Sequence, residues 1–175
     1  LSNVSKFETF ALATDDFDHD GDHEIALVHR SNQDHGIYLN LLNVLTTDGK
    51  VTDVIEKAST VLINDSFTSN NPVTISIASG FLNNDTIKDL AVAYGTYSPC
   101  GGCPDTWIQP VEVIDDPQTS EFNPLEKLIV NQNHRTELQL SGDHLVSLNL
   151  VSADLNLDGK YEVVVGANPN QVLSS

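Results

Sequence analysis

Asp16-Phe-Asp-His-Asp-Gly-Asp-His-Glu24 places five acidic side chains within nine residues, one at every second position of a short segment. Gly21 stands at position 6 of this segment, where a residue without a side chain lets the backbone turn sharply. So many negative charges repel one another unless a cation lies among them. Ca²⁺ takes six to eight oxygen ligands and is therefore the expected occupant. The alternative is a solvated acidic turn without metal.

The spacing also predicts which atoms bind the metal. We expect side-chain ligands at positions 1, 3, 5 and 9 and a backbone carbonyl at position 7. In the first loop these residues are Asp16, Asp18, Asp20, Glu24 and, at position 7, Asp22. A second complete copy has Gly159 at position 6, and its expected ligands are Asp154, Asn156, Asp158, Glu162 and, at position 7, Lys160.

A weaker copy of the loop lies between these two. It keeps oxygen-bearing side chains at positions 3, 5 and 9, which are Asn83, Asp85 and Asp89. Phe81 stands at position 1 in place of a carboxylate, and Thr86 replaces the glycine at position 6. Lys88 adds a positive charge that could pair with Asp85 or Asp89. We therefore expect no tightly held ion in this middle loop.

The loops form part of a longer repeat. They start at residues 16, 81 and 154, a recurrence that indicates an array of similar units. Each is followed by an apolar run typical of a strand. Each is preceded, at six and four residues, by apolar pairs, which are Phe10 and Leu12, Ile75 and Ile77, and Leu148 and Leu150. An EF-hand needs Glu at position 12 and flanking helices, whereas position 12 is Leu27 or Val165. The unit is therefore strand, calcium loop, strand.

This unit resembles the FG-GAP or VCBS repeat, the blade of integrin alpha-subunit propellers and of many secreted bacterial proteins. The resemblance covers residues 7–63, 72–140 and 145–173. It implies an all-β chain of propeller blades, each a sheet of antiparallel strands, with Ca²⁺ in the loops and an extracellular or cell-surface location. The chain departs from the family pattern at Phe10, which is followed by Ala11 rather than glycine, and at Gly166-Ala-Asn-Pro169, which has one inserted residue.

The repeat divides the chain into about 2.5 blades, at residues 1–70, 71–142 and 143–175. Strands are expected at 9–14, 24–29, 36–46 and 51–63 in the first blade, and at 111–115 and 125–132 late in the second. Propellers close with four to eight blades. We therefore expect neighbouring blades of a longer chain, or other copies of this chain, to cover the outer strands. The unpaired edge is expected along residues 161–167.

Residues 97–107 are rich in turn-forming residues and are expected to form an irregular insert. Cys100 and Cys103 lie here, and we interpret them as a local disulfide; half of a zinc site is the alternative. The insert also brings the aromatic residues Tyr94, Tyr97 and Trp107 close in sequence. These three side chains are the candidate platform for a glycan ligand.

The net charge of −17 argues against binding to nucleic acid or to anionic membranes, and no apolar run is long enough to span a membrane. Asn3 and Asn64 are possible glycosylation sites, and Asn84 is a less favourable one because it lies inside a loop. The chain shows no paired nucleophile and base, so we expect no enzyme activity. The leading hypothesis is a structural, adhesion or assembly module. The alternative is a non-catalytic, glycan-binding part of a larger secreted enzyme.

Overall fold

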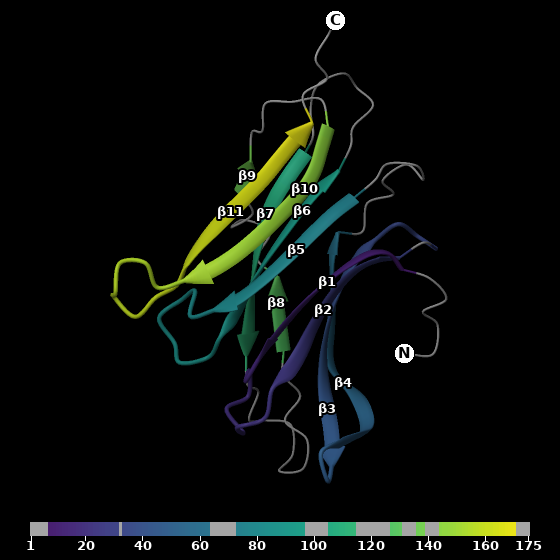
Figure 1. Cartoon of the computed structure of the whole chain (residues 1–175), viewed down its shortest axis with the longest axis vertical. Helices are drawn as coiled ribbons and strands as arrows, with labels where there is room; N and C mark the ends of the chain where they lie inside the picture. Colours follow the sequence, from purple (N-terminus) through teal and green to yellow (C-terminus); the bar gives the residue numbers. More distant parts are fainter. Residues whose placement is uncertain are drawn as a thin grey trace, which may run out of the picture.

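The computed structural model describes residues 7–31, 33–63, 73–96, 105–114, 127–130, 136–138 and 144–170 (Figure 1). Their regular elements are all β-strands, arranged in antiparallel sheets that do not close. The all-β prediction is therefore confirmed. No helix long and apolar enough to cross a membrane occurs among these residues. The predicted disulfide at Cys100 and Cys103 and the sequons at Asn3 and Asn64 lie outside the described residues.

The first sheet is a meander in which each strand pairs with the next along the chain. Its strands are β1 (Phe7–Asp15), β2 (Glu24–Ser31), β3 (Ile37–Thr47) and β4 (Lys50–Ile63). They match the predicted strands to within a few residues. A two-residue turn joins β3 to β4, with φ of 52° at Asp48 and 72° at Gly49. Positive φ at both residues is what a tight hairpin requires, and an Asp-Gly pair favours it.

The second sheet repeats this order, and a third begins it again. The second contains β5 (Val73–Gly80), β6 (Asp89–Thr96), β7 (Asp105–Ile114), β8 (Lys127–Val130) and β9 (Thr136–Leu138). The third consists of β10 (His144–Ala153) and β11 (Glu162–Asn170). In each sheet the first two strands flank one of the three loops. The predicted repeat of strand, loop and strand is therefore present three times.

Strand β7 begins earlier than the sequence indicated. It starts at Asp105 rather than at residue 111, so Trp107 belongs to a strand and pairs with Tyr94 of β6. Pro110 does not interrupt this strand. On its outer side, residues 106–108 pair with β9 and residues 111–114 with β8. Pro110 thus lies in the gap between the two partners, where its missing N–H is tolerated.

The three sheets stack face to face, with the second in the middle. Strand β5 contacts β1 on one side and β10 on the other, as Figure 1 shows. Side chains of β6 alternate between the two interfaces: Leu90, Val92 and Tyr94 pack towards the first sheet, and Ala91 and Ala93 towards the third. The core is therefore two layers of side chains on opposite faces of one sheet, which is the period-2 pattern of a strand buried on both sides.

Equivalent residues of the three inner strands differ in their burial. Ile75 and Ile77 of β5 are buried against the first sheet, and their counterparts in β10, Leu148 and Leu150, are buried against the second. The counterparts in β1, Phe10 and Leu12, are 58% and 54% exposed. The same positions therefore pack on the preceding sheet wherever the described chain provides one.

Gly80 provides a test of the packing between the second and third sheets. A Cβ atom at Gly80 would lie 2.6 Å from Cδ2 and 3.0 Å from Cβ of Tyr161. Because these atoms lie near the Tyr161 backbone, the ring cannot swing away freely. We expect Gly80→Ala to lower the free energy of unfolding by about 1–3 kcal/mol, measured by urea denaturation.

Gly166→Ala is the matched control for this substitution. Gly166 is also in a strand, but the nearest atom to its added Cβ is the Asn149 carbonyl oxygen, at 3.9 Å. This variant should stay within about 0.5 kcal/mol of the parent chain. Equal stability of the two variants would show that the sheets do not approach as closely as the structure has them.

Candidate metal centre

The first loop brings three carboxylates together. Strands β1 and β2 pair antiparallel up to Asp15 and Glu24, so the two ends of the loop are held side by side. One oxygen each of Asp16, Asp18 and Glu24 lies within 4.8 Å of the others. Among the described residues, this is the one group of three acidic, histidine or cysteine side chains that converges so closely. Positions 1, 3 and 9 of the predicted site therefore meet.

Backbone hydrogen bonds hold the first loop in shape. The Phe17 amide donates to Glu24 Oε2 at 2.9 Å, which ties position 2 to position 9. The Asp20 amide donates to Asp18 Oδ1 at 3.2 Å, and the Asp22 amide to Asp20 Oδ1 at 2.8 Å. Asp20 and Asp22, both predicted ligands, thus take part in this series of amide-to-carboxylate hydrogen bonds. They lie outside the converging group of three.

The turn itself depends on backbone conformations that most residues avoid. His19 has a φ of 59° and Gly21 a φ of 94°. A Cβ atom on Gly21 would meet nothing within 4 Å, so the requirement at this position is conformational rather than steric. The prediction of a sharp turn at position 6 is confirmed.

Two oxygen atoms in this loop are buried and have no hydrogen-bond partner among the described residues. Glu24 is fully buried, and its Oε1 accepts no hydrogen bond from the described part of the chain; the same holds for Asp16 Oδ1. Burial raises the pKa of Glu24, and the negative charges of Asp18 and Asp20 raise it further. A buried acceptor without a partner costs about 1–3 kcal/mol. A cation placed among these oxygens would remove that cost.

The donor set suits a hard cation. Carboxylate oxygens are the ligands that Ca²⁺ and Mg²⁺ prefer, and the set contains no sulfur or imidazole nitrogen among its converging atoms. Lys57 of β4 also reaches this cluster, with its Nζ 3.5 Å from Asp18 Oδ2. This ammonium offsets part of the negative charge but leaves Asp16 Oδ1 and Glu24 Oε1 without a partner.

The last loop has the same turn in a more exposed setting. Leu157 and Gly159 have φ of 64° and 88°, which match His19 and Gly21. The Leu155 amide donates to Glu162 Oε2 at 2.8 Å, as Phe17 does to Glu24. Here, however, the side-chain oxygens are already engaged. Asp154 accepts bonds from the Asp158 and Gly159 amides, and the Asn156 side-chain amide donates to Glu162 Oε1 at 2.8 Å.

The middle loop keeps the hydrogen-bond ladder but not the turn. The Asp85 amide donates to Asn83 Oδ1 at 2.7 Å, and the Ile87 amide to Asp85 Oδ1 at 2.9 Å. Neither Asn84 nor Thr86 is among the described residues with positive φ. Asp89 points away from this ladder, because its Oδ1 accepts the Val113 amide of β7 at 3.1 Å.

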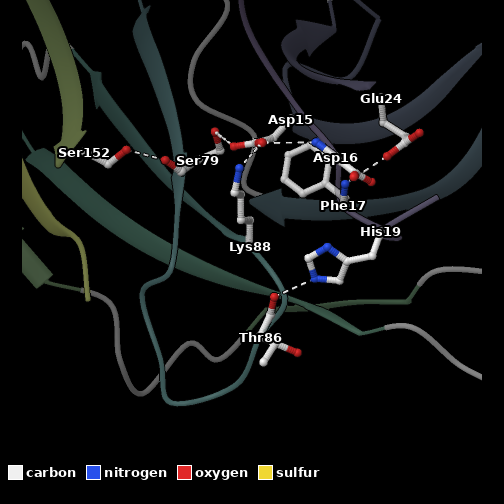
Figure 2. Close-up of polar contacts among 9 residues, drawn as sticks. All are labelled: Asp15, Asp16, Phe17, His19, Glu24, Ser79, Thr86, Lys88 and Ser152. Atoms are coloured by element: carbon white, nitrogen blue, oxygen red, sulfur yellow. Dashed lines mark hydrogen bonds and ion pairs between the residues drawn. The ribbon is translucent and has the colours of Figure 1, made fainter. Parts of the chain in front are cut away.

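Polar contacts join the loop regions of the three sheets (Figure 2). Lys88, which could have paired with Asp85 or Asp89, instead forms an ion pair with Asp15, at the end of β1. The Ser79 hydroxyl donates to Asp15 Oδ2 at 2.9 Å, and the Ser152 hydroxyl donates to the Ser79 carbonyl. His19 contacts the Thr86 carbonyl through Nε2, at 2.5 Å. These contacts attach the first loop to β5 and β5 to β10.

Sequence reasoning missed this network, although it contains a repeated signal. Ser79 and Ser152 both stand two residues before their loops, as Thr14 does. The repetition showed that a hydroxyl recurs at this position. It did not show that the hydroxyl bonds to the neighbouring sheet, because that contact joins residues 64 or 73 positions apart.

Comparison of the chain with family models, with curated proteins and with solved structures gave no match.

The pKa of Asp89 predicts a pH dependence of stability. Burial raises this pKa from 3.8 to about 6, and the nearby charges of Asp85 and Glu112 act in the same direction. The folded chain therefore binds a proton more tightly than the unfolded chain. Stability from this group is fully present below about pH 4 and is lost as the pH rises through 6. Its size is at most about 3 kcal/mol, at about 1.4 kcal/mol per pKa unit.

Asp89→Asn should remove this dependence, because the amide oxygen can still accept the Val113 amide. The measurement is urea denaturation at pH 4.5 and 7 in saturating calcium, for the variant and the parent chain. The parent should lose stability relative to the variant as the pH rises. Asp53→Asn, an exposed change on β4, serves as the control and should track the parent. A constant difference between Asp89→Asn and the parent at both pH values would contradict the assignment.

Proposed function

We propose that the chain is an extracellular calcium-binding module of the FG-GAP or VCBS type, with a structural, adhesion or assembly role. The observation that supports this best is the convergence of Asp16, Asp18 and Glu24. Asp16 and Glu24 each also have a buried oxygen that accepts no hydrogen bond from the described residues. The same turn recurs in the loop of residues 154–162. Because the two loops have the same spacing of oxygen-bearing side chains and the same turn, we expect them to bind the same kind of ion. A donor set made of oxygen atoms favours Ca²⁺.

The metal has a mechanical role in this proposal. It binds between the end of β1 and the start of β2 and neutralises acids that would otherwise repel one another across the turn. No reaction is assigned to it. Because the ion binds the folded loop and has little affinity for the unfolded chain, its binding free energy adds to the stability of the sheet.

We further propose that the three sheets are successive propeller blades. Support comes from their meander order and from the stacking of the inner strands β1, β5 and β10. Phe10 and Leu12 then form the surface that a preceding blade would cover. Val151 and Val164, exposed on the outer face of the third sheet, form the surface that a following blade would cover. The proposed partners are neighbouring blades or other copies of the chain.

The glycan-binding alternative has less support. Tyr94 is fully buried in the core between the first two sheets, so it cannot stack on a sugar. Trp107 is half-buried and packs against the same core. Tyr97 lies outside the described residues. A binding surface made by these three aromatic side chains together is therefore not available.

Calcium should stabilise the chain. At a free concentration 100 times the dissociation constant, one site adds about 2.7 kcal/mol, which corresponds to a rise in melting temperature of roughly 5–10 °C. The measurement is thermal unfolding with Ca²⁺, with Mg²⁺ and with chelator. Glu24→Gln and Asp20→Ala should each abolish most of the first loop's contribution. A melting temperature that is the same with Ca²⁺ and with chelator would contradict calcium binding.

Asp22→Asn is the matched control for these variants. It removes one charge from the same loop, but position 7 is expected to bind through its backbone carbonyl and the side chain is exposed. This variant should keep most of the calcium-dependent rise. A loss as large as that of Glu24→Gln would mean that overall negative charge, rather than a defined site, attracts the ion.

The proposed blade surfaces should promote association. Sedimentation velocity of residues 1–175 in calcium buffer is expected to show self-association that weakens in the double variant Phe10→Ser and Leu12→Ser. Val51→Ser is the control, because Val51 is similarly exposed but lies on the outermost strand of the first sheet. A chain that stays monomeric at every concentration tested would contradict the proposal, because the outer surfaces would then need no partner.

A further inference from the structure

A pocket of about 350 Å³ opens beside the middle loop, against β7 and β8. Four of its lining residues are apolar and three carry polar side chains; they are Leu82, Pro110, Val111, Ile129, Asn83, Asp89 and Glu112. The volume is at the lower end of the range for small-molecule sites. An apolar wall with a few polar groups at one side is also typical of such sites.

The charges of the pocket have one sign. Asp89 and Glu112 are both acidic, and the lining residues include no lysine, arginine or histidine. Asp89 is only 3% exposed, and its Oδ1 accepts the Val113 amide at 3.1 Å. A carboxylate in so dry a position is stabilised by a cation and destabilised by an anion. The occupant is therefore expected to carry positive charge.

The middle loop has diverged from the other two at positions that lie beside the pocket. In those loops the residue at position 9 is a glutamate whose Oε2 accepts the amide of position 2. Asp89 has a side chain one methylene shorter and bonds to β7 instead. With Phe81 at position 1, the loop also lacks the first carboxylate. Asn83 and Asp89 stand at positions 3 and 9, which are expected to bind metal in the other loops, and here they line a pocket.

We propose that this pocket binds a protonated primary amine on a short alkyl chain, such as a free alkylamine or a lysine side chain. The ammonium lies at Asp89 and Glu112, and the alkyl chain lies along Leu82, Val111 and Ile129. This site is independent of the calcium function proposed above.

Other cations fit the pocket less well. A guanidinium binds best to a carboxylate that offers both oxygens, and Asp89 already uses one for the Val113 amide. A quaternary ammonium is recognised by aromatic faces, and the lining residues include no aromatic side chain. An ammonium needs neither arrangement, since it acts as a compact point charge with three donors.

The test is a titration of the ¹⁵N-labelled chain with n-pentylammonium, followed by amide NMR shifts in calcium buffer at 150 mM NaCl. We expect saturable shifts confined to Leu82, Asp89, Val111 and Ile129, with a dissociation constant on the order of millimolar for so small a ligand. Tetramethylammonium and pentanoate should give no saturable shifts. A blocked Gly-Lys-Gly peptide distinguishes the two ligands. If it binds more tightly than n-pentylammonium, the ligand is a lysine side chain of a protein. If it binds more weakly, the ligand is a free amine.

Asp89→Asn should weaken n-pentylammonium binding at least tenfold. Asp53→Asn removes one charge elsewhere and should bind as the parent chain does. Glu112→Lys places a cation at the exposed side of the pocket and should abolish binding even if Asp89→Asn fails to fold. The proposal would be overturned if Glu112→Lys bound n-pentylammonium as the parent chain does. It would also be overturned if the shifts were spread over the acidic surface and were equal for tetramethylammonium.

Discussion

The fully buried Glu24 carboxylate is the constraint on which the first sheet depends. One oxygen orders the loop by accepting the Phe17 amide, and the other is buried and receives no hydrogen bond from the described residues. One oxygen of this carboxylate also lies within 4.8 Å of oxygens of Asp16 and Asp18. Glu24 is also the first residue of β2, opposite the last residue of β1. Any strain at this carboxylate is therefore transmitted directly to the register of the two strands. A cation at this point would neutralise the negative charge and would stabilise both the turn and the strand pairing.

The same end of β1 also connects the sheets to one another. Asp15, directly before the loop, accepts bonds from Ser79, which precedes the middle loop, and from Lys88, which lies within it. Ser152 then links β10 to β5 in the same way. Ordering the first loop therefore stabilises more than its own hairpin, because a displaced Asp15 would release both partners. These contacts form where the loops after β1, β5 and β10 lie together, at the same end of the three sheets (Figure 1).

The sequence was informative wherever a contact repeats within one sheet. The acid spacing predicted the turn at Gly21, and alternating apolar residues predicted the strands on either side. It failed where a contact joins different sheets. Trp107 was assigned to an irregular insert because neighbouring glycines and prolines dominate the local pattern, whereas its pairing with Tyr94 depends on β6. The sequence suggested that Lys88 could pair with Asp85 or Asp89 of its own loop, but its partner Asp15 is 73 residues away. The periodicity of apolar and acidic residues carries no information about contacts between residues so far apart in the sequence.

The middle loop shows how a copy of the repeat can lose its first carboxylate and remain ordered. Phe81, in place of the first carboxylate, packs edge-on against Tyr161 of the last loop, with ring centroids 5.7 Å apart. Lys88 lies over the same Phe81 ring, and the Tyr161 amide donates to the Phe81 carbonyl at 2.8 Å. Gly80 leaves the space that Tyr161 needs. Contacts with both neighbouring sheets thus hold this loop in place, and among the three loops such contacts are available only to the one in the middle. The outer loops, each with a neighbour on one side within the described chain, retain the acids.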